Sequence, residues 1–176
     1  MRIAIKFAYD GKNFNGYARQ PNLKTVEDRI INILKSTGYI DSPKKSFFRS
    51  ASRTDKGASS FGNVVAFNTD KPVGNILEDI NTDSELILFY GVKKISSDFY
   101  PRHAKMRVYS YYLKNKKYNI EKILSTSSIF TGTHNFLNFA RLETGKKPSR
   151  TIENIFLDIN DELIQIDFYA QTFLWN

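Results

Sequence analysis

The first hundred residues alternate between strand-like and helix-like patterns of hydrophobic and polar positions. Residues 2–10 place Ile3, Ile5, Phe7 and Tyr9 on one face and polar or charged side chains mostly on the other, which is typical of a half-buried strand. Apolar runs at residues 64–67 and 86–95 predict two more strands.

Two helices are predicted between these strands. Thr25, followed three residues later by Asp28, is typical of a helix start, and Gly38 is a suitable helix end. The apolar stripe of this helix is Val26, Ile30, Ile33 and Leu34. With a short helix over residues 73–80, the order becomes β-α-β-α-β, and one further strand is expected near residues 45–49.

The pattern after residue 105 predicts a second, smaller unit. Residues 106–112 alternate as a strand, residues 119–124 look helical, and Thr133 is expected to start another helical turn through His134 to Phe139. Residues 150–159 and 163–173 predict a hairpin around Asn160 and Asp161. Strand, helix and two strands make three-quarters of a ferredoxin-like unit. We therefore expect an α+β fold with domains at 1–104 and 105–176, the second one truncated.

Composition narrows the classes of function. Lys and Arg number 26 against 18 Asp and Glu, so the net charge is +8. This excess favours a polyanionic partner, although a merely basic surface explains it equally well. The chain has no Cys and only two His, which argues against a metal site. No apolar run has the length of a membrane span, so we expect a cytoplasmic protein that binds no membrane.

The stretch from Phe48 to Phe67 carries the strongest candidate chemistry. It is a loop of small residues that presents Arg53, Thr54 and Asp55 in succession just before a buried strand. Such a loop can fix a carboxylate and a guanidinium against a substrate. By itself, however, an Asp two residues before a Gly is more often a turn former, and Arg53 could be part of a surface ion pair.

The chain resembles the TruA-type tRNA pseudouridine synthases along essentially its whole length. Several segments match in the order that the family has. They are residues 9–11 (Tyr-Asp-Gly), 16–21 (Gly-Tyr-Ala-Arg-Gln-Pro), 52–57 (Ser-Arg-Thr-Asp-Lys-Gly), 99–111 with an Arg-x-Tyr-x-Tyr core, 132–136 (Gly-Thr-His-Asn-Phe), 150–152 (Arg-Thr-Ile) and 173–176 (Phe-Leu-Trp-Asn).

The resemblance implies isomerisation of uridine to pseudouridine in the anticodon stem-loop of tRNA, without a cofactor, by a homodimer. It implies two ferredoxin-like (RNP-like) halves with largely antiparallel sheets around a central cleft. Asp55 falls on the family's catalytic aspartate, Arg53 on the arginine that accompanies it, and Tyr109 on the tyrosine that contacts the target base. Tyr111 is expected to stay in the core. Candidates for RNA contact are Arg19, Gln20, Lys105 and Arg107, and for Arg19 and Gln20 a plain loop role is as plausible.

Pseudouridine formation explains why these residue types are needed. The N1–C1′ bond breaks, the base turns, and a bond forms through C5. A carboxylate can act at C1′, at C6 or on the ribose C2′ proton, and each role needs it ionised and out of water. Arg53 would keep Asp55 charged or hold a phosphate, and Tyr109 would stack on uracil or move a proton.

The chain also departs from the family. Lys56 and Ser59 replace a small residue and a histidine, and the segment between Arg102 and Arg107 is one residue shorter than in the bacterial form. The family continues past the last matching segment with a helix, a strand and a second active-site arginine. The alternative hypothesis is therefore a truncated module that binds tRNA but is catalytically incomplete.

Overall fold

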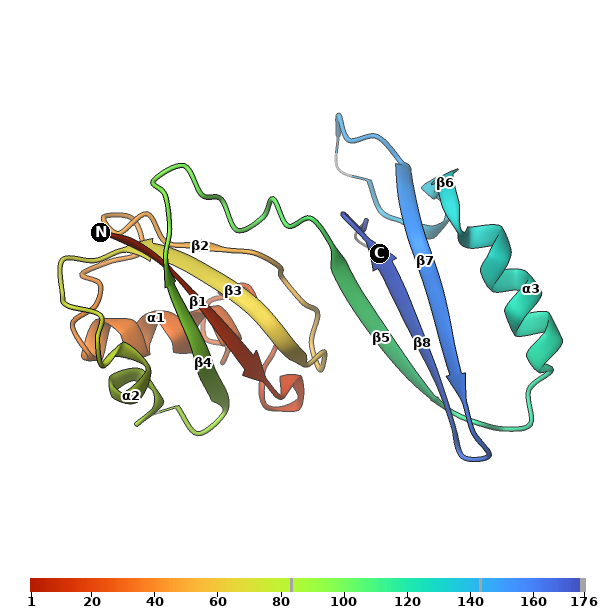
Figure 1. Ribbon diagram of the computed structural model, residues 1–176, viewed down its shortest axis with the longest axis horizontal. Coiled ribbons are helices and arrows are strands. Elements are labelled where there is room, and N and C mark those ends of the chain that lie inside the picture. The colour runs from red at the N-terminus through yellow and green to blue at the C-terminus, as the bar shows by residue number, and fades with distance from the viewer. Residues whose placement is uncertain (83, 143, 175–176) are drawn as a thin grey trace. The chain divides into compact units, whose positions relative to one another are not determined.

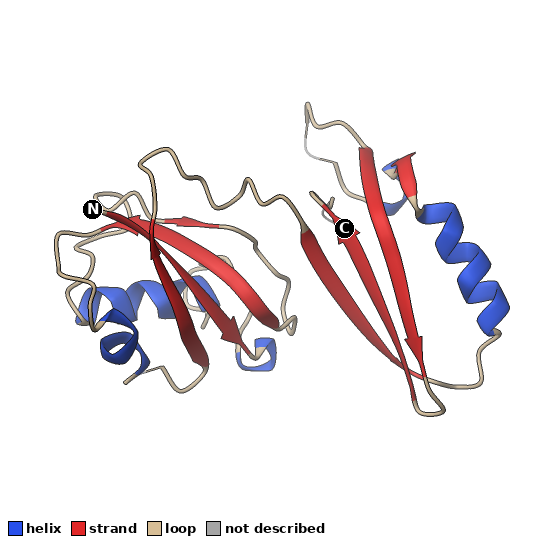
Figure 2. Ribbon diagram, in the orientation of Figure 1, coloured by secondary structure: helices blue, strands red, loops and turns tan. Residues whose placement is uncertain are grey.

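The computed structural model describes residues 1–82, 84–142 and 144–174, and it divides into two compact units. Unit 1 comprises Met1–His103 and unit 2 comprises Ala104–Asn176. Each unit contains one four-stranded antiparallel sheet with helices beside it (Figures 1 and 2). The expected α+β class with largely antiparallel sheets is thus confirmed.

The described part of unit 1, residues 1–82 and 84–103, contains four strands, two α-helices and one short 3-10 helix. In chain order these are β1 (Arg2–Tyr9), η1 (Gly11–Asn13), α1 (Val26–Ser36), β2 (Arg49–Ser50), β3 (Ser60–Asn68), α2 (Ile76–Asn81) and β4 (Ile87–Lys94). The sheet order is β2-β3-β1-β4, so β1 lies between β3 and β4 and is antiparallel to both. Every strand and helix predicted for this half is present, and the extra strand, β2, lies at the end of its predicted range.

The core of unit 1 forms because two apolar helix stripes pack on the alternating face of β1. Ile3, Ile5 and Phe7 are fully buried there, in one cluster with residues of α1 and α2, which lie on the same face of the sheet (Figure 1). Thr25 caps α1 as predicted, since its hydroxyl accepts a hydrogen bond from the Asp28 backbone N–H at 3.4 Å. Unit 1 is therefore a scaffold with a continuous core.

Over its described residues, unit 2 contains four strands, one α-helix and one 3-10 helix. They are β5 (Arg107–Lys114), α3 (Ile120–Phe130), β6 (Gly132–Asn135), η2 (Leu137–Phe139), β7 (Ser149–Ile159) and β8 (Leu163–Ala170). The sheet order is β5-β8-β7-β6. The hairpin of β7 and β8 is confirmed. The helical turn predicted from Thr133 through His134 is wrong there: both residues lie in β6, because Gly132 has a φ of 103° and turns the chain out of α3 to pair with β7.

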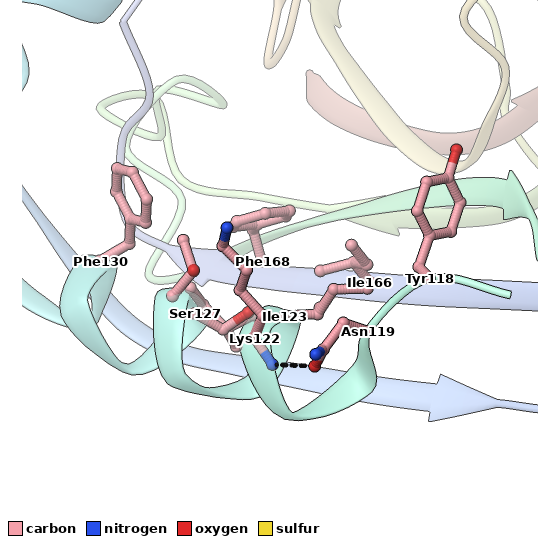
Figure 3. Close-up of a pocket in the computed structure, with 10 residues that line it drawn as sticks. Tyr118, Asn119, Lys122, Ile123, Ser127, Phe130, Ile166 and Phe168 are labelled. Carbon is pink, nitrogen blue, oxygen red and sulfur yellow. Dashed lines mark hydrogen bonds between the residues drawn. The ribbon is translucent and has the colours of Figure 1, made fainter.

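Most of the sheet in unit 2 is only partly covered. Ile164 and Ala170 are fully buried and Ile152 nearly so. Between α3 and the sheet runs an apolar groove of about 360 Å³, and Figure 3 shows Ile123 of α3 together with Ile166 and Phe168 of β8 in its lining. Tyr111 is 58% exposed, so its predicted core position is wrong.

Candidate functional site

The segment between β2 and β3, residues 51–59, is anchored to the sheet at its start. We call it the Asp55 loop. The side chain of Asn63, buried in β3, accepts a hydrogen bond from the Ser52 N–H at 3.2 Å and donates one to the Ser52 carbonyl at 3.0 Å. The Ala51 N–H donates to the Val64 carbonyl at 2.8 Å. The backbone at the start of the loop is thereby tied to the middle of β3.

Thr54 is held from two sides. Its hydroxyl lies 2.8 Å from the hydroxyl of Tyr9, the last residue of β1, and its carbonyl accepts a hydrogen bond from the Tyr17 N–H at 3.0 Å. Tyr17 is fully buried, and this burial raises the pKa of its hydroxyl. Gly16 has a φ of 93°, and a Cβ there would lie 3.5 Å from the Thr54 carbonyl oxygen. The positive φ, rather than the space available, is what favours glycine at this position beside the loop.

The far end of the Asp55 loop is tied to the residues that follow β1. The Ser59 hydroxyl accepts from the Gly11 N–H at 3.0 Å and donates to an Asp10 carboxylate oxygen at 3.2 Å. Gly11 lies so close to the loop that a Cβ on it would be 2.1 Å from the Ala58 carbonyl oxygen. The Ser59 departure from the family therefore has a structural role here, because its side chain closes the loop against Asp10 and Gly11.

These anchors leave Arg53 and Asp55 exposed. Both side chains are exposed, whereas the anchored residues Ser52 and Thr54 are partly buried. The ion pairs recorded among the described residues are Arg19–Glu27, Lys45–Asp41 and Lys71–Asp79, none of which involves the loop. The carboxylate and the guanidinium are both available to a ligand.

Arg19 and Gln20 lie just after Tyr17, on the segment that packs against the loop. Arg19 forms an ion pair with Glu27 at 3.5 Å, and the Gln20 side chain donates to the Asn15 carbonyl at 3.0 Å. The other Glu27 carboxylate oxygen accepts from the Ser50 hydroxyl at 2.9 Å. This network links the segment, the start of α1 and β2, and it gives both candidate RNA contacts a structural role as well.

The remaining candidates lie in unit 2. Tyr109 is half-buried in the edge strand β5, opposite Phe168 in the register, and its ring meets that of Phe173 edge-on at 4.6 Å. Arg107 donates to the Gln171 carbonyl, and Lys105 is exposed just before the strand. Tyr109 is therefore fixed by a neighbouring ring.

The described residues hold no group of three or more His, Asp or Glu side chains that could bind a metal ion. Over the same residues, no helix combines the length and the hydrophobicity that crossing a membrane requires.

Sequence reasoning identified Asp55 but missed the residues that hold its loop. Tyr9 was assigned to a strand face, whereas its hydroxyl also binds Thr54. One signal was available: the matching segments at residues 9–11, 16–21 and 52–57 are far apart in the chain yet meet at this loop through Gly11, Tyr17 and Thr54. These three segments, distant in the chain, therefore come together in space at the Asp55 loop.

Relatives with an assigned name agree with the resemblance. The tRNA pseudouridine synthase A of Thermococcus sibiricus is 42% identical over 176 residues, that of Thermococcus kodakarensis 38% over 177, and that of Methanosarcina barkeri 40% over 179. The alignments cover 99% of this chain or more and 66% of each relative. No family model matches the chain. With such identity along its whole length, the chain belongs to the family of tRNA pseudouridine synthases A.

Proposed function

We propose that this protein isomerises uridine to pseudouridine in the anticodon stem-loop of tRNA, with Asp55 as the catalytic carboxylate. The observation that carries the proposal is the Asp55 loop, which unit 1 anchors at Ser52, Thr54 and Ser59 while Asp55 stays exposed. Rigid placement of a reactive group on an otherwise accessible loop is what a catalytic site needs. The curated relatives carry the name of this activity.

The chemistry assigns a role to each candidate residue. Asp55 attacks the extruded nucleotide or removes its proton, and Arg53 binds the flanking phosphate or keeps the carboxylate ionised. Tyr109 stacks on the uracil and moves a proton through its hydroxyl. Because Asp55 is exposed, the bound RNA itself must exclude water from the carboxylate.

Each unit is proposed to be a ferredoxin-like half. For unit 1, the support is its order of elements, β-α-β-β-α-β, together with the sheet order β4-β1-β3-β2. In unit 2, β5, α3, β7 and β8 follow the same order as the first four of these elements. We propose that the two halves bound the RNA-binding cleft, that the division lies at residues 104 and 105, and that the protein acts as a homodimer in the cytoplasm, where tRNA is found.

Chemical mapping of pseudouridine in a tRNA transcript tests the proposal. After incubation with the 176-residue chain, we expect new pseudouridine in the anticodon arm, and we expect Asp55→Ala to abolish it. Circular dichroism of the variant controls for folding, which an exposed side chain should scarcely affect. An unmodified anticodon arm, or full modification by Asp55→Ala, would refute the assignment.

A second candidate function is binding of tRNA without isomerisation. It is favoured by one observation, that the chain spans about two thirds of the length of the relatives it matches. Gel mobility of tRNA across a salt series separates the two. Salt-sensitive binding without turnover supports the binding module, whereas turnover excludes it as the sole function.

A further inference from the structure

Two irregularities in pairing flank β1 on opposite sides. Between β1 and β3, Phe7 pairs with Asn63 but Tyr9 pairs with Ser60, so Phe61 and Gly62 face Ala8 alone. Between β1 and β4, Lys6 pairs with Gly91 and Phe7 with Phe89, which leaves Tyr90 as the extra residue. Such bulges re-aim side chains and are frequent beside active sites.

The first bulge exposes an aromatic ring that strand alternation would bury. In β3, Val65 and Phe67 are fully buried and Asn63 nearly so, and regular alternation would place Phe61 on the same face. Phe61 is instead 88% exposed, more than any other large hydrophobic side chain among the described residues. The bulge therefore leaves the Phe61 ring on the surface, where a ligand can reach it.

The second bulge is followed by a contact between the Tyr90 side chain and the backbone of Phe61. The Tyr90 hydroxyl donates to the Phe61 carbonyl, and the Lys6 ammonium lies 5.6 Å from the centre of the Tyr90 ring. Gly62 leaves space for the Lys6 stem, because a Cβ there would be 3.1 Å from Lys6 Cε, and it would be in ordinary contact with the Tyr90 hydroxyl oxygen at 3.5 Å. We call Lys6, Phe61 and Tyr90 the aromatic-basic platform.

The platform adjoins both the Asp55 loop and a basic hollow. Tyr9 connects it to the loop, since its backbone pairs with Ser60 and its hydroxyl binds Thr54. From Lys6 a hollow of about 580 Å³ extends over the open sheet face, with Lys93 and Lys94 also in its lining and no acidic residue. The surroundings of the two rings are thus suited to a polyanion.

We propose that the platform is a subsite for single-stranded RNA, which binds a nucleotide adjacent to the one processed at Asp55. The base stacks on Phe61, and Lys6 neutralises a phosphate. Rings that stack on unpaired bases beside lysines that follow the backbone are how proteins hold single-stranded RNA. This inference rests on the proposed function, and it adds the residues that grip the substrate next to the reacting base.

Fluorescence anisotropy with a labelled hairpin RNA that has a single-stranded loop tests the subsite. We expect Phe61→Ala to raise the dissociation constant about tenfold and Phe61→Tyr to leave it nearly unchanged, because stacking needs a ring. Lys6→Gln should lower the slope of log K against log salt by about 0.7, the effect of one lost contact to a phosphate. The matched control is Phe47→Ala: Phe47 is 58% exposed, but its carbonyl binds Arg2 at the opposite end of β1.

Release of hydrogen from uridine C5 is measured on the same samples, so that two kinds of failure can be told apart. Should the unaltered chain neither bind RNA nor release hydrogen, the proposed function falls and the subsite with it. Should it do both, and Phe61→Ala bind RNA as tightly as Phe47→Ala does, the subsite alone is overturned. Thermal melting shows whether Phe61→Ala is folded. Phe61→Tyr keeps the ring, so its dissociation constant should stay close to that of the unaltered chain.

Discussion

The two units each contain a four-stranded antiparallel sheet but differ in how that sheet is covered. In unit 1, α1 and α2 pack on one face, and a single cluster of buried side chains runs from Ile3 to Phe89. In unit 2, α3 is the one α-helix within the described residues, and Val108, Tyr111, Tyr112 and Phe156 on its strands stay about half exposed. A sheet forms a core only where a second layer covers it.

This difference explains where the candidate catalytic loop is placed. The Asp55 loop is anchored to β3, β1 and the segment before α1, all of which belong to the well-covered unit. Catalytic groups need supporting residues that are themselves fixed by packing. Unit 2 presents Tyr109 from an edge strand, fixed by a contact with Phe173. We therefore expect unit 1 to unfold more cooperatively than unit 2.

The largest effect is expected from truncating matched rings in the two units. Phe7→Ala removes a fully buried ring in unit 1 and should lower the free energy of unfolding by about 3–5 kcal/mol. Phe156→Ala removes a ring that is 53% exposed in unit 2 and should cost less than about 1 kcal/mol. Urea unfolding followed by hydrogen exchange of each unit measures both. Equal losses would show that the two sheets are covered equally well.

A smaller effect is expected at the contact between Gly11 and the Asp55 loop. Gly11→Ala puts a methyl group into the space of the Ala58 carbonyl, so the loop must move, at a cost of about 1–3 kcal/mol and with a large loss of activity. Gly74→Ala is the control, because a Cβ there meets nothing within 4 Å. If Gly11→Ala isomerises uridine at the unaltered rate, the loop does not depend on this contact.

The smallest effect is expected from a polar contact in unit 1 between Tyr39, which follows α1, and Asp79 of α2. The Tyr39 hydroxyl donates to Asp79 at 2.6 Å, and burial, with this hydrogen bond, raises the pKa of Tyr39 to about 12. Because the pKa is higher in the folded state, this contribution to stability is complete below pH about 10 and is lost as the pH rises through about 12.

Tyr39→Phe should therefore reduce the stability that unit 1 loses as the pH rises, and it should leave unit 2 unaffected. Unfolding midpoints of the unaltered chain and the variant, measured at pH 9 and near pH 12 by urea titration, give the difference. If both proteins lose the same stability between these two pH values, the Tyr39–Asp79 hydrogen bond is not the source of that loss. The hydrogen bond also lowers the pKa of Asp79, so that carboxylate stabilises the fold above its ordinary pKa and loses this effect as the pH falls.

Periodicity predicted the elements of unit 1 well because local and tertiary preferences agree there. The Thr25 cap, the stripe of α1 and the alternation of β1 all describe faces that become buried. In unit 2 the same reasoning assigned Tyr111 to the core and His134 to a helix, and both were wrong. Alternation identifies a face that can be buried, but it does not say whether another layer covers it.

The candidate site shows the same limit. Asp55 and Arg53 became candidates through the resemblance of several segments to a family, and their loop was expected from its small residues. The hydrogen bonds of Thr54 and Ser59, and the bulge that exposes Phe61, depend on pairing between distant segments. A pattern within one segment holds no information on such pairing.

The central claim is that the carboxylate of Asp55, on its anchored loop, carries out the isomerisation. The most direct measurement is the release of tritium from tRNA labelled at uridine C5, for the unaltered chain, Asp55→Asn and Asp41→Asn. Asp41 is an exposed carboxylate in unit 1 that pairs with Lys45 at 3.8 Å, outside the loop. We expect release by the unaltered chain and by Asp41→Asn, and none by Asp55→Asn. Equal release by all three proteins would contradict a catalytic role of Asp55.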